Sequence, residues 1–294
     1  VEPLVDWAVR DPNALVLDPA VGDGAFLQVA ARRVASRSQL HGFDINADAV
    51  AVTRRTLGSV GPESPKVSVC DFLLQESAGG LFTQGGNFDA VVGNPPYVRF
   101  QLFAESAARA ESIARASGVK LSGLASSWAV FAIHAASFLT EQGRLALILP
   151  EELIGAGYAE AVRRFFRRRF AETVAVSFEG EMFPDSQERV VAVFCEGRAG
   201  EQGGRLRLLS APSARSLAGL VAADFPGAER FAPGDEPHRW RPQDSDDGSE
   251  VLERLVTSGY FTPLREIAKV GIGWVSGAND FFVLRPSEVD RRGL

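Results

Sequence analysis

The chain has 294 residues, a length that accommodates about two domains of ordinary size or one large α/β unit. Hydrophobic residues make up 46% and charged residues 23% of it, so the chain can bury a core and is neither disordered nor collagen-like. A formal net charge of -6 argues against an overall polycation that would bind phosphate over its whole surface.

Several sequence features bear on location and on metals. The apolar stretch Trp128 to Pro150 is interrupted by Thr140 to Arg144, so no membrane span is expected. The start, Val1-Glu2-Pro3, shows no basic segment leading into an apolar one and no initiator Met, which predicts a cytoplasmic location and a longer parent protein. Two cysteines, Cys70 and Cys195, form no disulfide framework, and with three scattered histidines they match no metal spacing.

Apolar β-branched runs alternate with helical patterns through the first two-thirds of the chain. We predict strands at residues 14–17, 40–43, 66–69, 88–92, 144–149, 173–177 and 190–194. We predict helices at residues 24–36, 47–57, 126–139 and 158–170. Crossovers of this length predict a doubly wound, mostly parallel sheet with helices on both faces, in which ligands bind beyond the carboxyl ends of the strands.

The texture changes after residue 196. Residues 197–204 are rich in glycine, and residues 224–250 carry four prolines and several aspartates. We interpret residues 197–262 as a linker or irregular surface segment. A new ordered stretch is predicted to begin near Pro263 and to run to the end of the chain at residue 294.

The first predicted strand leads directly into a turn that contains Gly22 and Gly24, and then into a helix. Glycines at such a turn let a ligand approach the backbone, and the helix N-terminus offers amide donors. The dinucleotide fingerprint is not met, because its third glycine falls on Leu27, and no P-loop lysine follows. The turn therefore favours a nucleoside-like ligand without a critical pyrophosphate, with an ordinary tight turn as the alternative.

The next two strands also end in residues that carry chemistry. Asp44 ends the second strand 20 residues after Gly24, where an acid commonly accepts hydrogen bonds from ribose hydroxyls. The alternative is a helix N-cap provided by Asp44 or Asn46. After the third strand, Asp71 is suited to accept from an adenine amino group and Phe72 to pack on the base, the alternative being a solvated turn acid beside a core aromatic.

The tetrapeptide Asn94-Pro95-Pro96-Tyr97 directly follows the fourth strand. Its two prolines stiffen the loop and remove two backbone donors, which leaves the Asn94 side-chain oxygen and the Pro95 carbonyl as acceptors for one amino group. Accepting both hydrogens draws the lone pair of an aromatic amine out of conjugation and makes the nitrogen a usable nucleophile. Tyr97 offers a flat face on which a planar substrate stacks. The alternative is a rigid turn.

These residues together resemble the S-adenosylmethionine-dependent amino-methyltransferases, specifically the N6-adenine DNA methyltransferases of the TaqI and Eco57I type. The resemblance spans residues 1–196, which it marks as a methyltransferase domain, and includes the helix-Gly-strand-Pro segment from Phe138 to Pro150. It implies a seven-stranded Rossmann-like sheet whose last strand is antiparallel. The family's upstream cofactor motif is reduced here to Val1 to Trp7, so this chain resembles a catalytic core from a longer protein.

The resemblance also implies the site residues. The implied cofactor contacts are Asp18, Pro19, Ala20, Gly22, Gly24, Phe26, Asp44, Ile45, Asp71, Phe72 and Asn94. The implied catalytic residues are Asn94, Pro95, Pro96 and Tyr97. Phe183 is implied as a second face for the flipped base beside Tyr97, and residues 264–284 resemble the opening of a target-recognition domain, which gives a truncated second domain at 263–294.

The resemblance therefore implies transfer of a methyl group from S-adenosylmethionine to N6 of an adenine flipped out of duplex DNA, without a metal, and with a fused or separate nuclease or specificity subunit. Two alternatives remain open. One is N5-methylation of a protein glutamine, since the Asn-Pro-Pro-Tyr logic serves any planar amide or amine. The other is an inactive cofactor-binding scaffold in a modification or phage-defence complex.

Five arginines lie in the helix predicted at 158–170: Arg163, Arg164, Arg167, Arg168 and Arg169. They are candidates for phosphate contacts, but on a helix these positions spread over much of the surface. A solvated face is the favoured interpretation.

Overall fold

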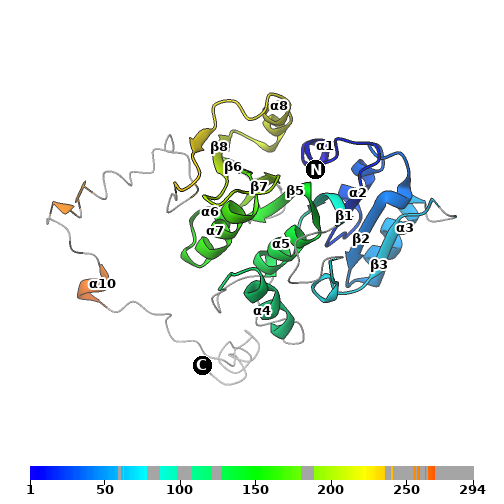
Figure 1. Ribbon diagram of the computed structural model, residues 1–294, viewed down its shortest axis with the longest axis horizontal. Coiled ribbons are helices and arrows are strands. Elements are labelled where there is room, and N and C mark those ends of the chain that lie inside the picture. The colour runs from blue at the N-terminus through cyan, green and yellow to red at the C-terminus, as the bar shows by residue number, and fades with distance from the viewer. Residues whose placement is uncertain are drawn as a thin grey trace, which may run out of the picture. The chain divides into compact units, whose positions relative to one another are not determined.

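The computed structural model describes residues 1–58, 61, 63–77, 87–97, 107–120, 127–179, 189–235, 240, 254–255, 257–258, 262 and 264–268 (Figure 1). The chain divides into two compact units, Val1–Gln243 and Asp244–Leu294. The described part of the second unit includes the short helix α10, Leu264–Ile267. Across these ranges, no helix has the length and apolar character needed to cross a membrane.

The first unit is built on a sheet of nine strands. The strands are β1 Val16–Asp18, β2 Leu40–Asp44, β3 Lys66–Val69, β4 Phe88–Gly93, β5 Leu139–Pro150, β6 Glu172–Phe178, β7 Val190–Glu196, β8 Arg205–Ala211 and β9 Glu229–Phe231. Their order is β3-β2-β1-β4-β5-β7-β6-β8-β9. β7 is antiparallel to both of its neighbours and β9 is antiparallel to β8, whereas the other pairs are parallel. The predicted doubly wound α/β fold with an antiparallel seventh strand is confirmed.

Helices cover both faces of this sheet (Figure 1). They are α1 Glu2–Ala8, α2 Ala25–Ala30, α3 Ala47–Leu57, α4 Ala107–Ala116, α5 Ser127–Ser137, α6 Glu152–Gly155, α7 Glu160–Arg169 and α8 Leu217–Ala222. The alternation of side chains along a strand separates two buried clusters. On β4, Val91 packs with α4, α5 and α7, while Ala90 and Val92 pack with α1, α2, α3 and α8.

Two element boundaries differ from the prediction by five residues or more. α2 ends at Ala30 rather than at residue 36, because the amides of Arg32 and Arg33 bond the carbonyls three residues earlier, at 3.1 and 2.8 Å, in a tight turn. β5 begins at Leu139, five residues before the predicted start, because it extends back past Gly143 toward α5. In β5 a side chain at Gly143 would meet the Phe88 carbonyl oxygen at 2.9 Å.

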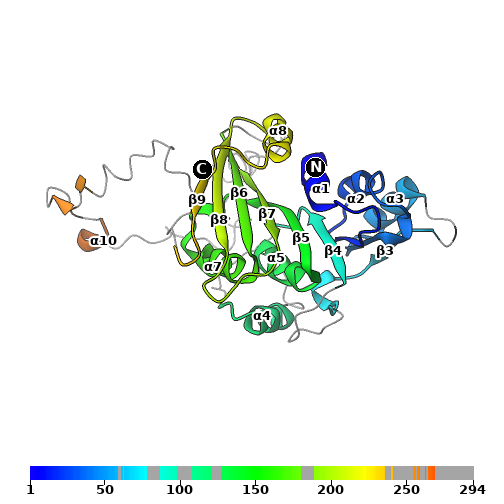
Figure 2. The same cartoon turned by 45° about the horizontal axis from the view of Figure 1, so that its top comes forward.

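The segment 197–262 is not irregular where the structure describes it. It contributes β8, α8 and β9, so the sheet has nine strands instead of the predicted seven (Figure 2). β8 pairs with β6 along all seven of its residues, from Arg205 opposite Glu172 to Ala211 opposite Phe178. Trp240 is 2% exposed and its amide donates to the Ile154 carbonyl at 2.9 Å, which brings the chain back to α6.

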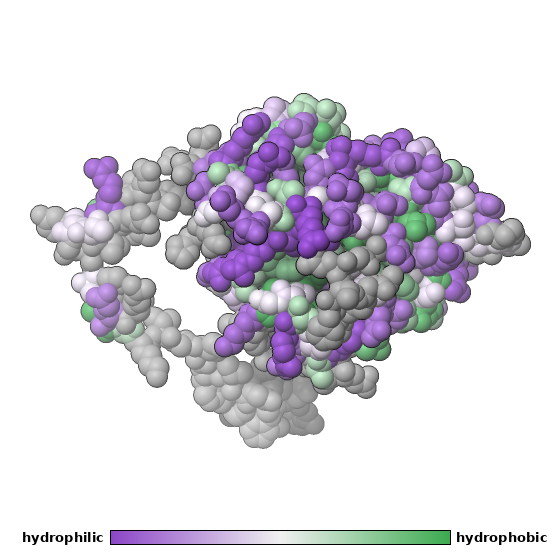
Figure 3. All heavy atoms as spheres, in the orientation of Figure 1, coloured by the Kyte–Doolittle hydropathy of each residue, from purple (hydrophilic) through white to green (hydrophobic). Residues whose placement is uncertain are grey.

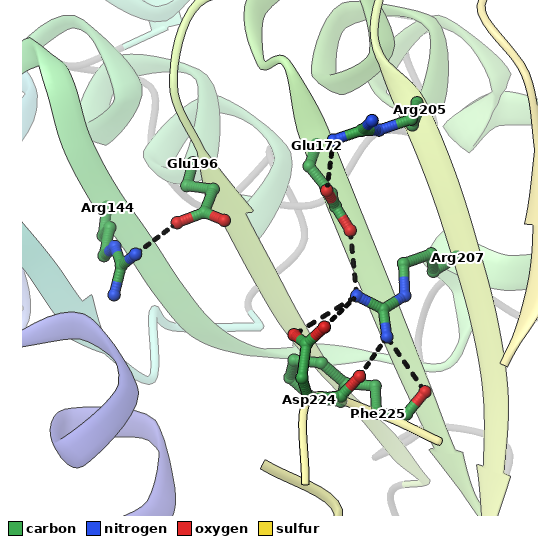
Figure 4. Close-up of polar contacts among 7 residues, drawn as sticks. All are labelled: Arg144, Glu172, Glu196, Arg205, Arg207, Asp224 and Phe225. Atoms are coloured by element: carbon green, nitrogen blue, oxygen red, sulfur yellow. Dashed lines mark hydrogen bonds and ion pairs between the residues drawn. The ribbon is translucent and has the colours of Figure 1, made fainter. Parts of the chain in front are cut away.

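A buried arginine holds this extension to the sheet (Figure 4). The Arg207 side chain is 9% exposed and pairs with Glu172 of β6 at 3.0 Å and with Asp224 at 3.3 Å. It also donates to the carbonyls of Asp224 and of Phe225, the latter at 3.0 Å. Asp224 and Phe225 have φ values of 56° and 54°, so Arg207 bonds two consecutive left-handed residues while Phe225 packs on Phe194 with ring centroids 5.0 Å apart.

The arginines of α7 divide into two groups. Arg163 and Arg167 are buried, at 4% and 6% exposure, and neither lies on a solvated face. Arg163 donates to the carbonyls of Leu153 and Ala156, and Arg167 donates to those of Gly204 and Ala232. The two side chains therefore join α7 to α6, β8 and the segment after β9. Of the others, Arg164 pairs with Glu160 on the exposed face of the helix.

Candidate active site

The polar residues predicted as a site meet along one edge of the sheet. β3, β2, β1 and β4 are adjacent and parallel, so their carboxyl ends lie side by side. Asp18 ends β1, Asp44 ends β2, Asp71 follows β3 and Asn94 follows β4. This edge is where doubly wound sheets bind their ligands.

The glycine turn between β1 and α2 is fixed from both sides. Gly22 and Gly24 have φ values of +52° and +85°, in the left-handed region that favours glycine. The Gly22 amide donates to Asp44 Oδ2 at 2.9 Å, and Thr53 Oγ1 donates to the Gly22 carbonyl at 2.9 Å. A side chain at Gly24 would also meet Thr53 at 2.9 Å. These contacts hold the turn close to β2 and α3. Because Gly22 and Gly24 have no side chains, the backbone at these two positions is not covered by side chains of the turn itself.

Asp44 joins this turn to the start of α3. Its second oxygen, Oδ1, accepts from the Asn46 amide at 2.8 Å. The N-cap of α3 is Asn46, whose Oδ1 accepts from the amides of Asp48 and Ala49 at 2.9 and 3.3 Å. A carboxylate oxygen accepts two hydrogen bonds, so each Asp44 oxygen retains capacity for a ligand hydroxyl. Beside it the Ile45 side chain is 67% exposed, an apolar surface next to an acid.

Asp18 is a buried acid with an unpaired oxygen. The residue is 1% exposed, Oδ1 accepts from the Ala20 amide at 3.1 Å, and Oδ2 has no hydrogen-bond partner within the described part of the chain. Burial and, to a smaller extent, the charges of Asp44 and Asp23 raise the pKa of Asp18 to about 7, while the hydrogen bond from the Ala20 amide opposes this shift. Oδ1 also lies against β4, 2.8 Å from where a Gly93 side chain would begin.

The other predicted cofactor residues differ in exposure. Pro19 and Phe26 are buried, with Phe26 at 7% exposure in the core, and Ala20 is half-buried. Asp71 caps a short 3-10 turn, with Oδ1 accepting from the Leu73 amide at 2.9 Å. Phe72 is 2% exposed and its ring lies 5.6 Å from Phe131, so it occupies the core aromatic position that was the alternative for it.

The Asn-Pro-Pro-Tyr loop follows β4 with its first residue exposed. Asn94 is exposed, Pro95 is buried, and Tyr97 is half-buried between the two core clusters. The Tyr97 hydroxyl donates to Asn94 Oδ1 and lies 3.0 Å from the Ile148 carbonyl of β5. Ser127, the first residue of α5, donates from Oγ to the Pro96 carbonyl. Sequence reasoning missed Ser127, because a single serine before an apolar helix carries no distinctive signal.

Phe183, predicted as the second face for a planar substrate, lies outside the described residues.

The space-filling view shows a hollow with apolar residues at its floor beside α5 and α7, with hydrophilic residues around it (Figure 3). β5 ends at Pro150 next to α6, and β5 is the neighbour of β4 in the sheet. The structure therefore brings Asp18, Gly22, Asp44 and Asn94 to one edge and places Tyr97 against β5.

Two models of known protein families match parts of this chain. The Eco57I restriction-modification methylase model matches residues 38–182. The model for the C-terminal domain of the type II methyltransferase M.Eco57I matches residues 245–294, so that the two models together match about two thirds of the chain. Over both matched segments the chain is similar to the Eco57I-type methyltransferases, which agrees with the resemblance on which the sequence interpretation depends.

Relatives and solved structures agree with this family. The type II methyltransferase M.BstVI of Geobacillus stearothermophilus is 27% identical over 95% of this chain and 56% of its own length. The chain spans about half the length of the curated relatives it matches. A methyltransferase subunit of a type I restriction-modification system from Streptococcus thermophilus has a TM-score of 0.62 at 15% identity, covering 88% of this chain and 55% of that one.

A protein from Listeria monocytogenes assigned to the class I S-adenosylmethionine-dependent methyltransferases has a TM-score of 0.55 at 15% identity, covering 77% of this chain and 68% of that one. The fold is therefore one that S-adenosylmethionine-dependent methyltransferases share. The residues of this chain fit that cofactor. The unpaired Asp18 Oδ2 matches a cationic ligand, and the open Gly22 backbone beside Asp44 and Ile45 matches a nucleoside.

Proposed function

We propose that this chain is the catalytic part of a DNA methyltransferase that transfers a methyl group from S-adenosylmethionine to the N6 amino group of an adenine flipped out of duplex DNA. The match to a restriction-modification methylase model and the similarity to a type II methyltransferase support DNA as the substrate. The resemblance of Asn94-Pro95-Pro96-Tyr97 to the N6-adenine enzymes supports adenine as the base.

One observation carries the proposal: the exposed Asn94 side chain stands at the end of β4, directly beside the strand that ends in Asp18. In our account, Asn94 Oδ1 and the Pro95 carbonyl accept the two amino hydrogens of the base. The nitrogen lone pair, drawn out of conjugation, then forms the bond to the methyl carbon while the bond from sulfur to that carbon breaks with its electron pair. One N–H proton leaves to solvent or a nearby acceptor, so positioning supplies most of the catalysis.

The cofactor side of the site uses residues of the same edge. S-adenosylmethionine, when bound, supplies an electrophilic methyl group carried on a sulfonium. The Asp44 oxygens would accept from ribose hydroxyls, Ile45 would cover the nucleoside, and the Asp18 carboxylate would face the positive charge of the cofactor. Asp71 and Phe72 are retained as proposed adenine contacts, in which the buried Phe72 would contribute only the edge of its ring.

The base side of the site rests on two aromatic residues. The half-buried Tyr97 would offer its ring for stacking on the flipped adenine. Phe183 is proposed as the opposite face. The segment 263–294 is proposed as the start of a target-recognition domain, which the match of residues 245–294 to the C-terminal domain of M.Eco57I supports. A nuclease or specificity subunit, fused or separate, is proposed as the partner.

Mass spectrometry of nucleosides tests this proposal. The chain and its full-length parent are incubated with S-adenosylmethionine and unmethylated plasmid and phage DNA, and the DNA is then digested to nucleosides. We expect N6-methyladenine above the level in the reaction without enzyme. N4-methylcytosine or 5-methylcytosine in its place would overturn the assignment of the base. Methylated glutamine in an added translation factor, with unmodified DNA, would identify the protein-glutamine alternative, and cofactor binding without any methyl transfer would identify the scaffold alternative.

A further inference from the structure

The catalytic loop has few backbone hydrogen bonds of its own. Pro95 and Pro96 lack N–H groups, so the carbonyl is the one backbone polar group that each of them offers. The two proline rings restrict φ in this loop. The orientation of its peptide planes is then set by the hydrogen-bond partners of its carbonyls. The direction of the Pro96 carbonyl matters most here, because the same peptide plane carries the amide of Tyr97.

Two hydrogen bonds join this loop to other elements, and a third element lies close to its start. Asp18 of β1 lies against Gly93 immediately before it, with Oδ1 2.8 Å from where a side chain would begin. The Tyr97 hydroxyl lies 3.0 Å from the Ile148 carbonyl of β5. Between these two, Ser127 Oγ donates to the Pro96 carbonyl across 31 residues of sequence. The middle contact is the one that a side chain makes directly to the backbone of the Pro-Pro pair.

Ser127 is well suited to hold that carbonyl. It is 2% exposed, and a hydrogen bond in such a position is little weakened by competing water. It begins α5, in which ten of eleven residues are buried and which packs against β5, so the hydroxyl stands on an element with little freedom to move. Besides satisfying its own hydrogen-bonding capacity, the Ser127 hydroxyl connects α5 to the backbone of the candidate catalytic loop.

We propose that Ser127 is a positioning residue for methyl transfer: by holding the Pro96 carbonyl it sets the plane of the Pro96–Tyr97 peptide, and with it the direction of the Pro95 acceptor and the Tyr97 ring. This inference rests on the proposed function. It assigns a role to a residue outside the Asn-Pro-Pro-Tyr motif, on the helix that follows it in the chain. Ser127 acts through the loop and contacts neither substrate nor cofactor in this account.

Kinetics with three variants test the role. Ser127→Ala removes the donor, Ser127→Cys keeps the size with a weak donor, and Ser127→Thr keeps the hydroxyl. We expect kcat to fall about tenfold in Ser127→Ala and less in Ser127→Cys, with recovery in Ser127→Thr and little change in KM for S-adenosylmethionine. The matched control is Ser137→Ala at the other end of α5, whose hydroxyl donates to the His134 carbonyl of its own helix at 2.7 Å. Equal kcat in Ser127→Ala and the unaltered chain would overturn the proposal.

A second readout does not depend on activity. The chain has three tyrosines, so ring-labelled tyrosine gives a simple NMR spectrum in which Tyr97→Phe identifies the Tyr97 signal. We expect Ser127→Ala or, if that variant does not fold, Ser127→Cys to shift or broaden the Tyr97 signal, and the control Ser137→Ala to leave it unchanged. An unmoved Tyr97 signal would overturn the positioning role. A moved signal in a chain that transfers no methyl group to DNA would instead count against the proposed function alone.

Discussion

The amide of Gly22 donates to Asp44 Oδ2 at 2.9 Å, which ties the glycine turn after β1 to the acid that ends β2. The glycine turn and the end of β2 are about twenty residues apart in the sequence. This hydrogen bond joins them into one continuous surface. The same carboxylate accepts from Asn46 and so fixes the start of α3. A ligand that bonds Asp44 therefore meets a group that is already oriented, because two backbone amides hold it in place.

Replacing Asp44 tests this surface. We expect Asp44→Ala to raise the Kd for S-adenosylmethionine by about ten- to a hundredfold, since the variant loses hydrogen bonds to a charged group and releases the Gly22 turn. Asp48→Ala is the matched control, because Asp48 carries the same charge, is exposed and lies one residue into α3. Isothermal titration calorimetry measures both values. Similar Kd values for the two variants would show that Asp44 has no special part in cofactor binding.

The buried acid Asp18 predicts a pH dependence of binding. Its pKa lies at about 7 because of burial, so near neutral pH much of the protein carries it protonated. A cationic cofactor favours the ionised form, and we therefore expect affinity for S-adenosylmethionine to rise as pH increases from 6 to 8. Calorimetry at three pH values measures the trend. Asp18→Asn should bind weakly at every pH, and a wild-type affinity that does not vary with pH would contradict this role.

Asp18 also predicts a pH dependence of stability. Its folded pKa lies above the value of 3.8 for an exposed aspartate, so the ionised form is penalised in the folded state. The penalty is absent below about pH 4, grows as pH rises through 7 and is complete above it. We expect Asp18→Asn without ligand to gain in Tm relative to the unaltered chain as pH rises from 5 to 8. A constant Tm difference over that range would show that Asp18 does not titrate there.

Arg207 predicts a large difference between two arginines that share one partner. Both Arg205 and Arg207 pair with Glu172 at 3.0 Å, but the Arg205 side chain is 67% exposed and that of Arg207 is 9% exposed. We expect Arg207→Ala to lower the free energy of unfolding by about 3 kcal/mol, because it leaves the carbonyls of Asp224 and Phe225 without this donor and removes the buried partner of Glu172. Arg205→Ala should change it by less than about 1 kcal/mol. Urea denaturation compares the two, and equal losses would mean that burial does not decide the contribution.

Much of this site could be predicted because the information is local. A strand followed by Gly22 and Gly24, by Asp44 or by the Asn-Pro-Pro-Tyr loop is visible in the sequence, and the parallel topology brings those strand ends together. Ser127 could not be predicted, since its partner at Pro96 is 31 residues away and a serine before a helix has many ordinary reasons to be there. The role of Phe72 stays a prediction, because the sequence pattern of an aromatic residue beside a site is the same as that of an aromatic residue in the core.

The missed strands have a different cause. Residues 197–204 are rich in glycine, which favours an irregular segment. The next residues, Arg205-Leu206-Arg207-Leu208, nevertheless alternate polar and apolar side chains, which is the pattern of a strand. The Arg207 side chain is buried, which is rare for a charged group. No sequence pattern shows that it pairs with Glu172 and donates to the carbonyls of two residues in the left-handed conformation. The burial of Arg163 and Arg167 is equally hard to predict, since their carbonyl partners lie outside α7, at Leu153 and at Gly204.

The measurement that tests the central claim most directly compares Asn94→Ala with the unaltered protein, by cofactor titration and by methyl transfer from labelled S-adenosylmethionine to DNA. The account predicts an unchanged order of magnitude for the cofactor Kd and transfer at least about a hundredfold slower, because the variant loses the group that orients the amine. Near-normal transfer by Asn94→Ala would contradict the account, since the Asn-Pro-Pro-Tyr loop would then not be the catalytic element.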